Sequence, residues 1–378
     1  MKFLYGGALL FAATTAAWAS GYSDFNAAIA ARTDHNPADT IRFATQALAA
    51  PDLPEHLRST AFRARAQAYT LSNQYDLAIA DYGSTLAIRP AQYDVLSERG
   101  SIYLAQKKYD LARADFAAAI HLRPELDSGY ISEAAANLAE EKYDDAIGNY
   151  DEALVTSPDH TSLILMRGEA NRLALRYAQA IADFNAVIQK DSKYAAAYRL
   201  RAFAYLESGD VSQAVSDYEQ ALDLDPNDLA LRQSAGIAQW DNGDYREAAR
   251  NLEKSAADPR HVMYSELWLH VADLKRGDDD TELGQRINKL DLKTWPGPLL
   301  SLFAGATTVD DVLSLAKHGD AGAQRDQSCE ASFFIAEWHL DQKEVSAAGP
   351  LLEQTRSMCR RGFPESYAAR EELKRLTP

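Results

Sequence analysis

Residues 59–92 read STAFRARAQAYTLSNQYDLAIADYGSTLAIRPAQ, and the same pattern recurs along the chain every 34 residues. Alanine marks the period most clearly, at Ala78, Ala112, Ala146, Ala180, Ala214 and Ala248. An aromatic residue precedes most of these alanines by three positions and another follows most of them by four, as Tyr75 and Tyr82 do in the first repeat. A fixed period of about 20 to 50 residues indicates a repeat architecture. The pattern covers residues 59–260 as six consecutive repeats, numbered 1 to 6, with Ser59 at position one of repeat 1.

The spacing predicts a pair of helices in every repeat. Small residues occupy position eight, where they let the first helix approach the second closely: Ala66, Gly100, Ala134, Gly168, Ala202 and Gly236. Proline follows the second helix in four repeats and stops it, at Pro90, Pro124, Pro158 and Pro226. Since one hairpin cannot bury its apolar face alone, neighbouring hairpins are expected to stack around a continuous core and to leave a concave inner surface.

Seven residues of repeat 1, in their types and spacing, resemble the consensus of the tetratricopeptide repeat (TPR) family: Phe62, Ala66, Tyr69, Tyr75, Ala78, Tyr82 and Pro90. The resemblance implies an all-α fold, a right-handed α-solenoid of stacked TPR helix hairpins. It also implies a protein that binds other proteins or peptides and does not catalyse a reaction.

Two charged positions vary together. Position seven carries Arg65, Arg99, Arg167 and Arg201, and position twenty-three of the same repeats carries Asp81, Asp115, Asp183 and Asp217. In repeats 3 and 6, where position seven is Glu133 or Ala235, position twenty-three is Asn149 or Asn251. Pairing within a hairpin avoids contacts between like charges, so we interpret these residues as structural ion pairs. The alternative is a ladder of arginines that binds a ligand.

The N-terminal flank predicts export. Residues 1–19 have the features of a cleavable signal peptide, with Lys2, a short apolar run and Ala17-Trp18-Ala19 as the cleavage site. This predicts a periplasmic location. Residues 20–58 are interpreted as a divergent hairpin that caps the repeats, with a helix starting at Asn36 and Pro37.

Composition restricts the partners. The chain has 39 basic and 55 acidic residues, a formal net charge of −16, and no run of Lys or Arg. A polyanion would be repelled, so nucleic acid is not an expected partner. No stretch after the signal is long and apolar enough for a membrane-spanning helix.

Beyond residue 260 the period weakens, but helical patterns continue. They predict divergent TPR-like hairpins and a C-terminal capping helix over residues 261–378, with helices at 264–275, 281–290, 298–303, 309–318, 330–340, 346–358 and 365–376. In order and spacing, including the connection at Trp295-Pro296, this part resembles the NlpI-like group of bacterial envelope TPR proteins. The resemblance implies a periplasmic adaptor that brings peptidoglycan hydrolases and a tail-specific protease together, and it allows a homodimer. Members of that group are lipoproteins, whereas the first cysteine of this chain is Cys329.

No pattern indicates catalysis. The histidines are scattered, with no pair spaced to place two metal ligands on one helical face. There is no glycine-rich phosphate loop and no nucleophile elbow. The acidic run from Asp278 to Asp280, with Glu282, lacks the alternating ligands of a calcium loop and is interpreted as a solvated helix start. We therefore expect no enzyme activity, no cofactor and no metal.

The two cysteines, Cys329 and Cys359, fall at positions one and thirty-one of the last repeat-like frame, the two ends that meet at the open end of a hairpin. An exported chain favours a disulfide there, stabilising by about 3 to 4 kcal/mol. Two buried free thiols are the alternative.

Positions five, nine and twelve of the first helix are expected to face the concave groove. The predicted peptide-binding residues are Arg63, Leu165, Arg172, Arg199, Phe203, Leu206, Ile237 and Trp240, with Leu104, Ile131 and Leu138 on the same face. Apolar anchors with a few guanidinium groups suit an extended or helical peptide that carries hydrophobic side chains and a carboxylate. The alternative is that position twelve packs between adjacent hairpins.

These features predict a periplasmic scaffold or adaptor for proteins or peptides, with cell-envelope enzymes or a protease as candidate clients. The alternative is a fixed structural subunit of an envelope assembly, and an unrecognised hydrolase is the weakest reading.

Overall fold

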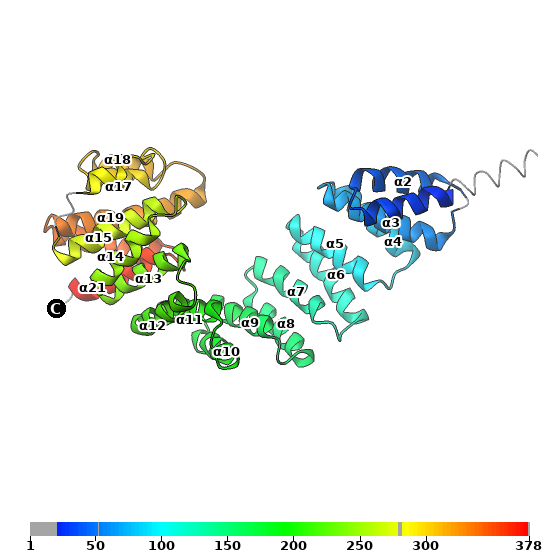
Figure 1. The fold of residues 1–378 in the computed structure, drawn as a ribbon, viewed down its shortest axis with the longest axis horizontal. Coiled ribbons are helices and arrows are strands. Elements are labelled where there is room, and N and C mark those ends of the chain that lie inside the picture. Colours follow the sequence, from blue (N-terminus) through cyan, green and yellow to red (C-terminus); the bar gives the residue numbers. More distant parts are fainter. Residues whose placement is uncertain (1–20, 52, 279–281, 377–378) are drawn as a thin grey trace, which may run out of the picture. The chain divides into compact units, whose positions relative to one another are not determined.

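The computed structural model describes residues 21–51, 53–278 and 282–376. All regular secondary structure in these ranges is helical, so the predicted all-α fold of stacked hairpins is confirmed (Figure 1). The chain divides into an N-terminal body, up to Ala174, and a C-terminal body, from Leu175 onward. The predicted signal peptide, residues 1–19, lies outside the described residues, as does part of the acidic run that begins at Asp278.

The N-terminal body is a stack of antiparallel hairpins. A helix over residues 21–33 and α2 (Pro37–Ala49) precede the repeats. The repeat helices are α3 (Glu55–Leu71), α4 (Tyr75–Ile88), α5 (Tyr93–Ala105), α6 (Tyr109–Leu122), α7 (Asp127–Ala139), α8 (Tyr143–Thr156) and α9 (Thr161–Leu173). Asn36 caps α2 by accepting a hydrogen bond from the backbone N–H of Asp39, and Pro37 takes the first helical position, as expected.

The turn inside each hairpin has a left-handed residue at position fifteen. This residue is Asn73, Lys107 or Glu141 in repeats 1 to 3, each with a φ between 57° and 59°. The next residue then donates its backbone N–H back to the first helix, as from Gln74 N to Tyr69 O at 2.9 Å. This bond satisfies carbonyl groups that the end of a helix leaves free, and it fixes where each first helix stops.

Position eight is small because the second helix passes directly over it. A Cβ atom added to Gly100 would lie 2.7 Å from the ring of Phe116. Ala66 and Ala134, at the same position, are fully buried, and so is Phe116 itself. The predicted close approach of the two helices is therefore present in repeats 1 to 3, and burying each large side chain there contributes about 1.5 to 3 kcal/mol.

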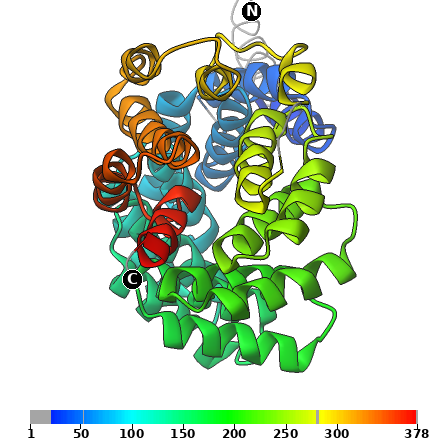
Figure 2. The same ribbon diagram turned by 90° about the vertical axis from the view of Figure 1, so that its left-hand side faces the viewer.

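The C-terminal body continues the repeats and then departs from them. Its helices are α10 (Tyr177–Lys190), α11 (Ala195–Ser208), α12 (Val211–Leu224), α13 (Leu229–Asn242), α14 (Tyr245–Ser255), α15 (Val262–Arg276), α16 (Leu283–Ile287), α17 (Gly297–Phe303), α18 (Val309–Leu315), α19 (Ala321–Asp341), α20 (Val345–Met358) and α21 (Pro364–Leu376). Gly209 and Gly243 take the left-handed turn position in repeats 5 and 6. α15 packs on α14, and Figure 2 shows α21, in red, beside the hairpin of α19 and α20.

One predicted boundary is wrong. The sequence pattern placed the start of a helix at residue 330, whereas α19 begins at Ala321. The cause is Asp320, whose side chain accepts a hydrogen bond from the backbone N–H of Ala323 and caps the helix nine residues earlier. Cys329 therefore lies within a helix and not at its first turn.

The two cysteines lie at disulfide distance, as predicted. The Cα atoms of Cys329 and Cys359 are 5.0 Å apart, and the pair joins α19 to the residue that follows α20. The structure has no free cysteine in the part of the chain that it describes.

Aromatic side chains fill the core of the C-terminal body. Trp240 on α13 packs edge-on against Trp268 on α15, with ring centroids 5.5 Å apart, and against Phe333 on α19 at 5.8 Å. Trp268 and Phe333 lie 5.1 Å apart. These contacts bind repeat 6 to the segment beyond it, and aromatic pairs of this kind stabilise by about 0.5 to 1.5 kcal/mol beyond area burial.

Candidate functional site

In repeats 1, 2 and 5, the Arg and Asp residues at positions seven and twenty-three form ion pairs inside their own hairpins, as predicted. Arg65 donates from Nε and Nη2 to both carboxylate oxygens of Asp81, at 2.6 and 2.8 Å. The same two-bond geometry joins Arg99 to Asp115 and Arg201 to Asp217.

The bound carboxylates raise the pKa of Arg65, Arg99 and Arg201, first through the side-chain hydrogen bond and against the effect of burial. In repeat 3 the pair is replaced by Asn149, which donates to Glu133 at 3.1 Å. These arginines are held inside the fold, which supports the structural interpretation over a ligand-binding ladder.

Three arginines at position seven also contact the preceding hairpin, and the sequence pattern did not predict these contacts. Arg65 Nη1 donates to Thr45 Oγ1 at 3.0 Å, and Arg167 Nη1 donates to Asp151 at 2.8 Å. Arg201 bonds to Asn185 in the same way. In repeats 4 and 5 the partner lies sixteen residues before its arginine, and that shared offset is the signal that could have predicted these two contacts. Thr45 lies twenty residues before Arg65.

Positions five, nine and twelve of the first helix of each repeat lie on one side of that helix and together form the first-helix face. In the N-terminal body, its two predicted arginines already have carboxylate partners. Arg63 donates to Glu98 from Nη2 at 2.7 Å and from Nε at 3.2 Å, and Arg172 donates to Glu169 at 2.6 and 2.9 Å. A client carboxylate would have to compete with these pairs.

The apolar residues of this part of the face differ in exposure. Leu165 is buried, whereas Leu104, Ile131 and Leu138 are half-buried. Their role in peptide binding stays a prediction.

In the C-terminal body the predicted groove is not open. Trp240 is fully buried, Leu206 and Ile237 are 5% and 8% exposed, and Phe203 is half-buried. The prediction that Trp240 is an exposed anchor is therefore wrong. Its indole lies in the aromatic core formed with α15 and α19, so position twelve packs in repeat 6, as the alternative proposed. Arg199 is exposed on this face.

The helix that covers this part of the first-helix face is α21, from the same chain. Arg370 Nη2 donates to the carbonyl oxygen of Leu206 at 3.0 Å, and Arg375 Nη2 donates to that of Trp240 at 3.2 Å. Tyr367 donates to Glu207 at 3.2 Å. The carbonyl groups of Leu206 and Trp240 lie in the last turns of α11 and α13, where a helix end attracts cations.

The docking of α21 also has an apolar part. Tyr367 is buried and packs in the cluster that contains Leu206 and Val211. The guanidinium of Arg375 lies over the ring of Trp240, 5.2 Å from its centroid. The sequence predicted α21 as a capping helix, but nothing in the repeat pattern indicated that it would contact the first helices of repeats 5 and 6.

Buried carboxyl groups gather where the C-terminal helices meet. Glu330 accepts hydrogen bonds from Tyr264 at 2.9 Å and from Trp295. Lys275 is bound by Glu337 at 3.1 Å and by Glu372. Burial raises the pKa of Glu337 to about 7, and burial with the nearby Glu330 raises the pKa of Glu365 to about 8.

Two kinds of feature are absent from the described residues. No group of three or more His, Cys, Asp and Glu side chains in those residues could hold a metal ion. Among the described helices, none combines the length and the apolar character needed to cross a bilayer.

Stacked helix hairpins with a first-helix face that holds a helix define a protein of the helical-repeat class. Tetratricopeptide repeat family models match residues 63–127, 132–195 and 195–228, which supports the TPR family for this part of the chain. TPR proteins are scaffolds that bind other proteins or peptides. No curated protein matches the chain.

Solved structures share the fold at low identity. A tetratricopeptide repeat protein from Parabacteroides merdae is 16% identical with a TM-score of 0.50, over 67% of this chain and 98% of that one. YrrB, described as a TPR protein with an unusual peptide-binding site, is 17% identical with a TM-score of 0.40, over 46% of this chain and 89% of its own. MamA from Desulfovibrio magneticus RS-1 is 16% identical with a TM-score of 0.42, over 46% and 97%.

Proposed function

We propose that this protein is an exported scaffold or adaptor whose first-helix face binds helical segments of client proteins. The observation that carries the proposal is the docking of α21, because it is a helix held on that face through Tyr367, Arg370 and Arg375. A surface that already binds one amphipathic helix has the geometry to bind another with the same pattern. A helical client would thus present an aromatic residue and basic residues, where the sequence alone suggested a carboxylate.

The proposal extends to the cell envelope. The signal-like residues 1–19 and the likeness to envelope TPR proteins support a periplasmic adaptor that brings peptidoglycan enzymes or a protease to their targets, as a monomer or a homodimer. Osmotic-shock fractionation tests the location, and sedimentation velocity tests the oligomeric state. Recovery of the protein in the cytoplasmic fraction would remove the envelope part of the proposal.

The binding face can be tested with the chain's own helix. A labelled peptide of residues 364–376 is titrated into the wild-type chain and into the full chain with Tyr367→Ala and Arg370→Ala. We expect the peptide to bind the double variant at least about tenfold more tightly, because its own α21 no longer occupies the face. Fluorescence anisotropy measures the affinity, and circular dichroism checks the fold.

Two controls make this test specific. A peptide with alanine at the positions of Tyr367, Arg370 and Arg375 should not bind. On the variant chain, Glu207→Ala removes the acceptor of the Tyr367 hydroxyl, and Glu253→Ala changes an exposed glutamate of the second helix of repeat 6. Only Glu207→Ala should weaken binding. Equal binding of the two peptides would contradict the proposal.

The ratio of bound partner to this protein distinguishes an adaptor from the alternative function, a fixed structural subunit. Brief cross-linking in cells followed by purification should recover clients in amounts below one per chain, and these should exchange with added competitor. One partner at a fixed ratio that does not exchange would favour the structural subunit.

A further inference from the structure

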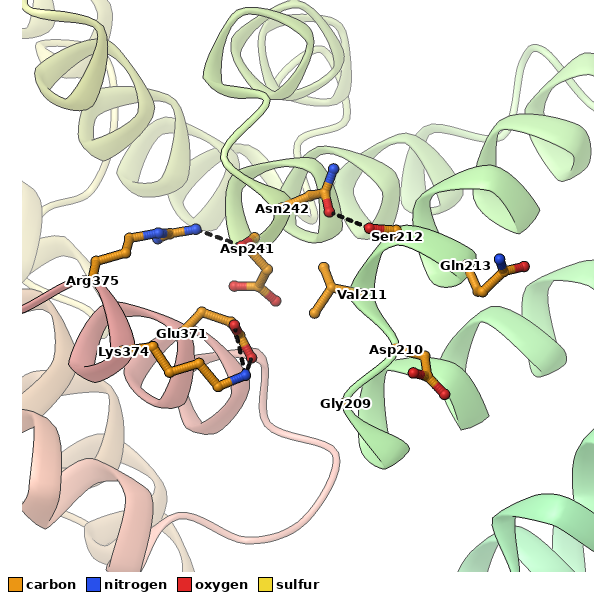
Figure 3. Close-up of a pocket in the computed structure, with 10 residues that line it drawn as sticks. All are labelled: Gly209, Asp210, Val211, Ser212, Gln213, Asp241, Asn242, Glu371, Lys374 and Arg375. Carbon is orange, nitrogen blue, oxygen red and sulfur yellow. Dashed lines mark hydrogen bonds and ion pairs between the residues drawn. The ribbon is translucent and has the colours of Figure 1, made fainter. Parts of the chain in front are cut away.

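A cavity lies beside the docked C-terminal helix, inside the C-terminal body (Figure 3). Its volume is about 610 Å³, within the usual range for small-molecule sites. Three elements line it: the turn between α11 and α12, the end of α13, and α21. Arg375, one of the residues that hold α21 on the first-helix face, is also one of the cavity's lining residues.

Asp241, at the end of α13, is the unusual residue of this cavity. Its side chain is 3% exposed, and neither carboxylate oxygen has a hydrogen-bond partner. Figure 3 shows the carboxylate directed into the space between Val211 and Glu371. A buried carboxylate with no donor lowers the stability of the fold more than an ordinary unsatisfied polar group does. The fold therefore contains an acceptor that no donor of the described residues satisfies.

The repeat frame does not require an acid at this place. Asp241 occupies position thirteen of repeat 6, and the same position holds Leu71, Ala105, Ala139 and Leu173 in repeats 1 to 4. Repeat 5 has an acid there, Glu207, but Glu207 accepts a hydrogen bond from Tyr367. An apolar side chain is thus compatible with the hairpin. The acidic group at Asp241 is a departure that the fold tolerates at a cost in stability.

The cations that line the cavity are held by other groups. Lys374 Nζ binds Glu371 at 2.9 and 3.0 Å, and Arg375 binds Glu372 at 2.9 Å. Arg375 also donates to the backbone carbonyl of Asp241 and not to its carboxylate. Burial raises the pKa of Asp241 well above its ordinary value, and the charge of Arg375 opposes this only in part.

We propose that this cavity binds an organic cation with N–H donors, a guanidinium or primary ammonium group, and that Asp241 is its counter-ion. The carboxylate lacks hydrogen-bond donors and a compensating positive charge, and such a group supplies both. The cavity holds a molecule of the size of an arginine or lysine derivative. Asp210, an exposed lining residue, adds a second negative charge to the wall of the cavity.

Calorimetric titration of the full chain tests the proposal with four probes. L-argininamide and L-lysinamide carry the two head groups, L-citrullinamide is the neutral isostere of the first, and tetramethylammonium is a cation without N–H donors. At least one of the first two should bind at millimolar or lower concentration. Citrullinamide should bind at least about tenfold more weakly, and tetramethylammonium should not bind.

Matched variants locate the site. Asp241→Asn keeps the size of the side chain and should weaken binding at least about tenfold, whereas Asp223→Asn, on the exposed face of α12, should leave it unchanged. Gln213→Trp, at an exposed lining position, narrows the cavity without changing its charge and should also reduce binding. It keeps the test valid if Asp241→Asn alters the fold. Equal binding of argininamide and citrullinamide, or binding that survives Asp241→Asn and Gln213→Trp, would overturn the proposal, and so would no binding by either cationic amide.

Discussion

The two bodies differ in their buried acids, although Asp217 of the C-terminal body is also paired with an arginine. In the N-terminal body, buried Asp81 and Asp115 each receive two hydrogen bonds from an arginine of the same hairpin. In the C-terminal body, Glu365 and Asp241 are buried with carboxylate oxygens that have no partner. A repeat frame places both members of an ion pair together each time it recurs. Helices outside the 34-residue repeats, such as α21, bury acids without a matching arginine. Burial there raises the pKa of Glu365 and of Asp241.

The largest expected difference between the bodies is at position twelve. Trp240→Ala should lower the free energy of unfolding by about 3 to 5 kcal/mol, because it empties the centre of the aromatic core. Leu138→Ala, at the same position of repeat 3, removes a half-buried side chain and should cost only about 1 to 2 kcal/mol. Urea unfolding followed by circular dichroism measures both. Equal losses would mean that the two bodies pack position twelve alike.

Buried acids should make the C-terminal body lose stability as the pH rises from about 4.5 to 8. The pKa values of Glu337 and Glu365 are raised from 4.5 to about 7 and about 8, so the folded state keeps protons that the unfolded state releases. Stability from these groups is full below pH 4.5 and is lost as pH rises toward 8, by about 3 to 4 kcal/mol for each group. Fluorescence of Trp240, Trp268, Trp295 and Trp338, all in this body, follows its unfolding.

Glu365→Gln is the matched control for this pH dependence. The amide cannot ionise, so the loss of stability between pH 5 and pH 8 should become smaller in the variant. An unchanged pH profile would show that Glu365 does not cause the effect.

The smallest effect concerns the ion pairs of the N-terminal body. Arg99→Ala should lower the free energy of unfolding by about 1 to 3 kcal/mol, because it leaves the buried Asp115 without its donors. Charge reversal at both positions, Arg99→Asp with Asp115→Arg, should recover part of the loss. If Arg99→Ala melts at the same temperature as the wild type but no longer binds a client, the alternative interpretation, a ladder of ligand-binding arginines, would be favoured.

The features that the sequence predicted are those set locally. The helix starts at Tyr75, Tyr109 and Tyr143 follow from the 34-residue period, and the pairing of Arg99 with Asp115 follows from their joint variation. The disulfide distance between Cys329 and Cys359 was also predicted.

The burial of Trp240 was not predicted, because it depends on α15 and α19, which lie outside the repeat frame. The contacts of Arg370 and Arg375 with the ends of α11 and α13 were missed for the same reason. A backbone carbonyl at a helix end is the same in every sequence, so no residue pattern marks it as a partner.

The docking of α21 sets the scale of affinity that a competing helix must reach. Only residues 359–363 separate α21 from the end of α20, so α21 is tethered close to its binding face. A short tether gives an effective concentration on the order of millimolar. A client with the same intrinsic affinity as α21 must therefore be present near that concentration to displace half of it. Binding measured on the intact chain understates the affinity of the face itself, and a client that anchors elsewhere on the array as well has the advantage over a free peptide.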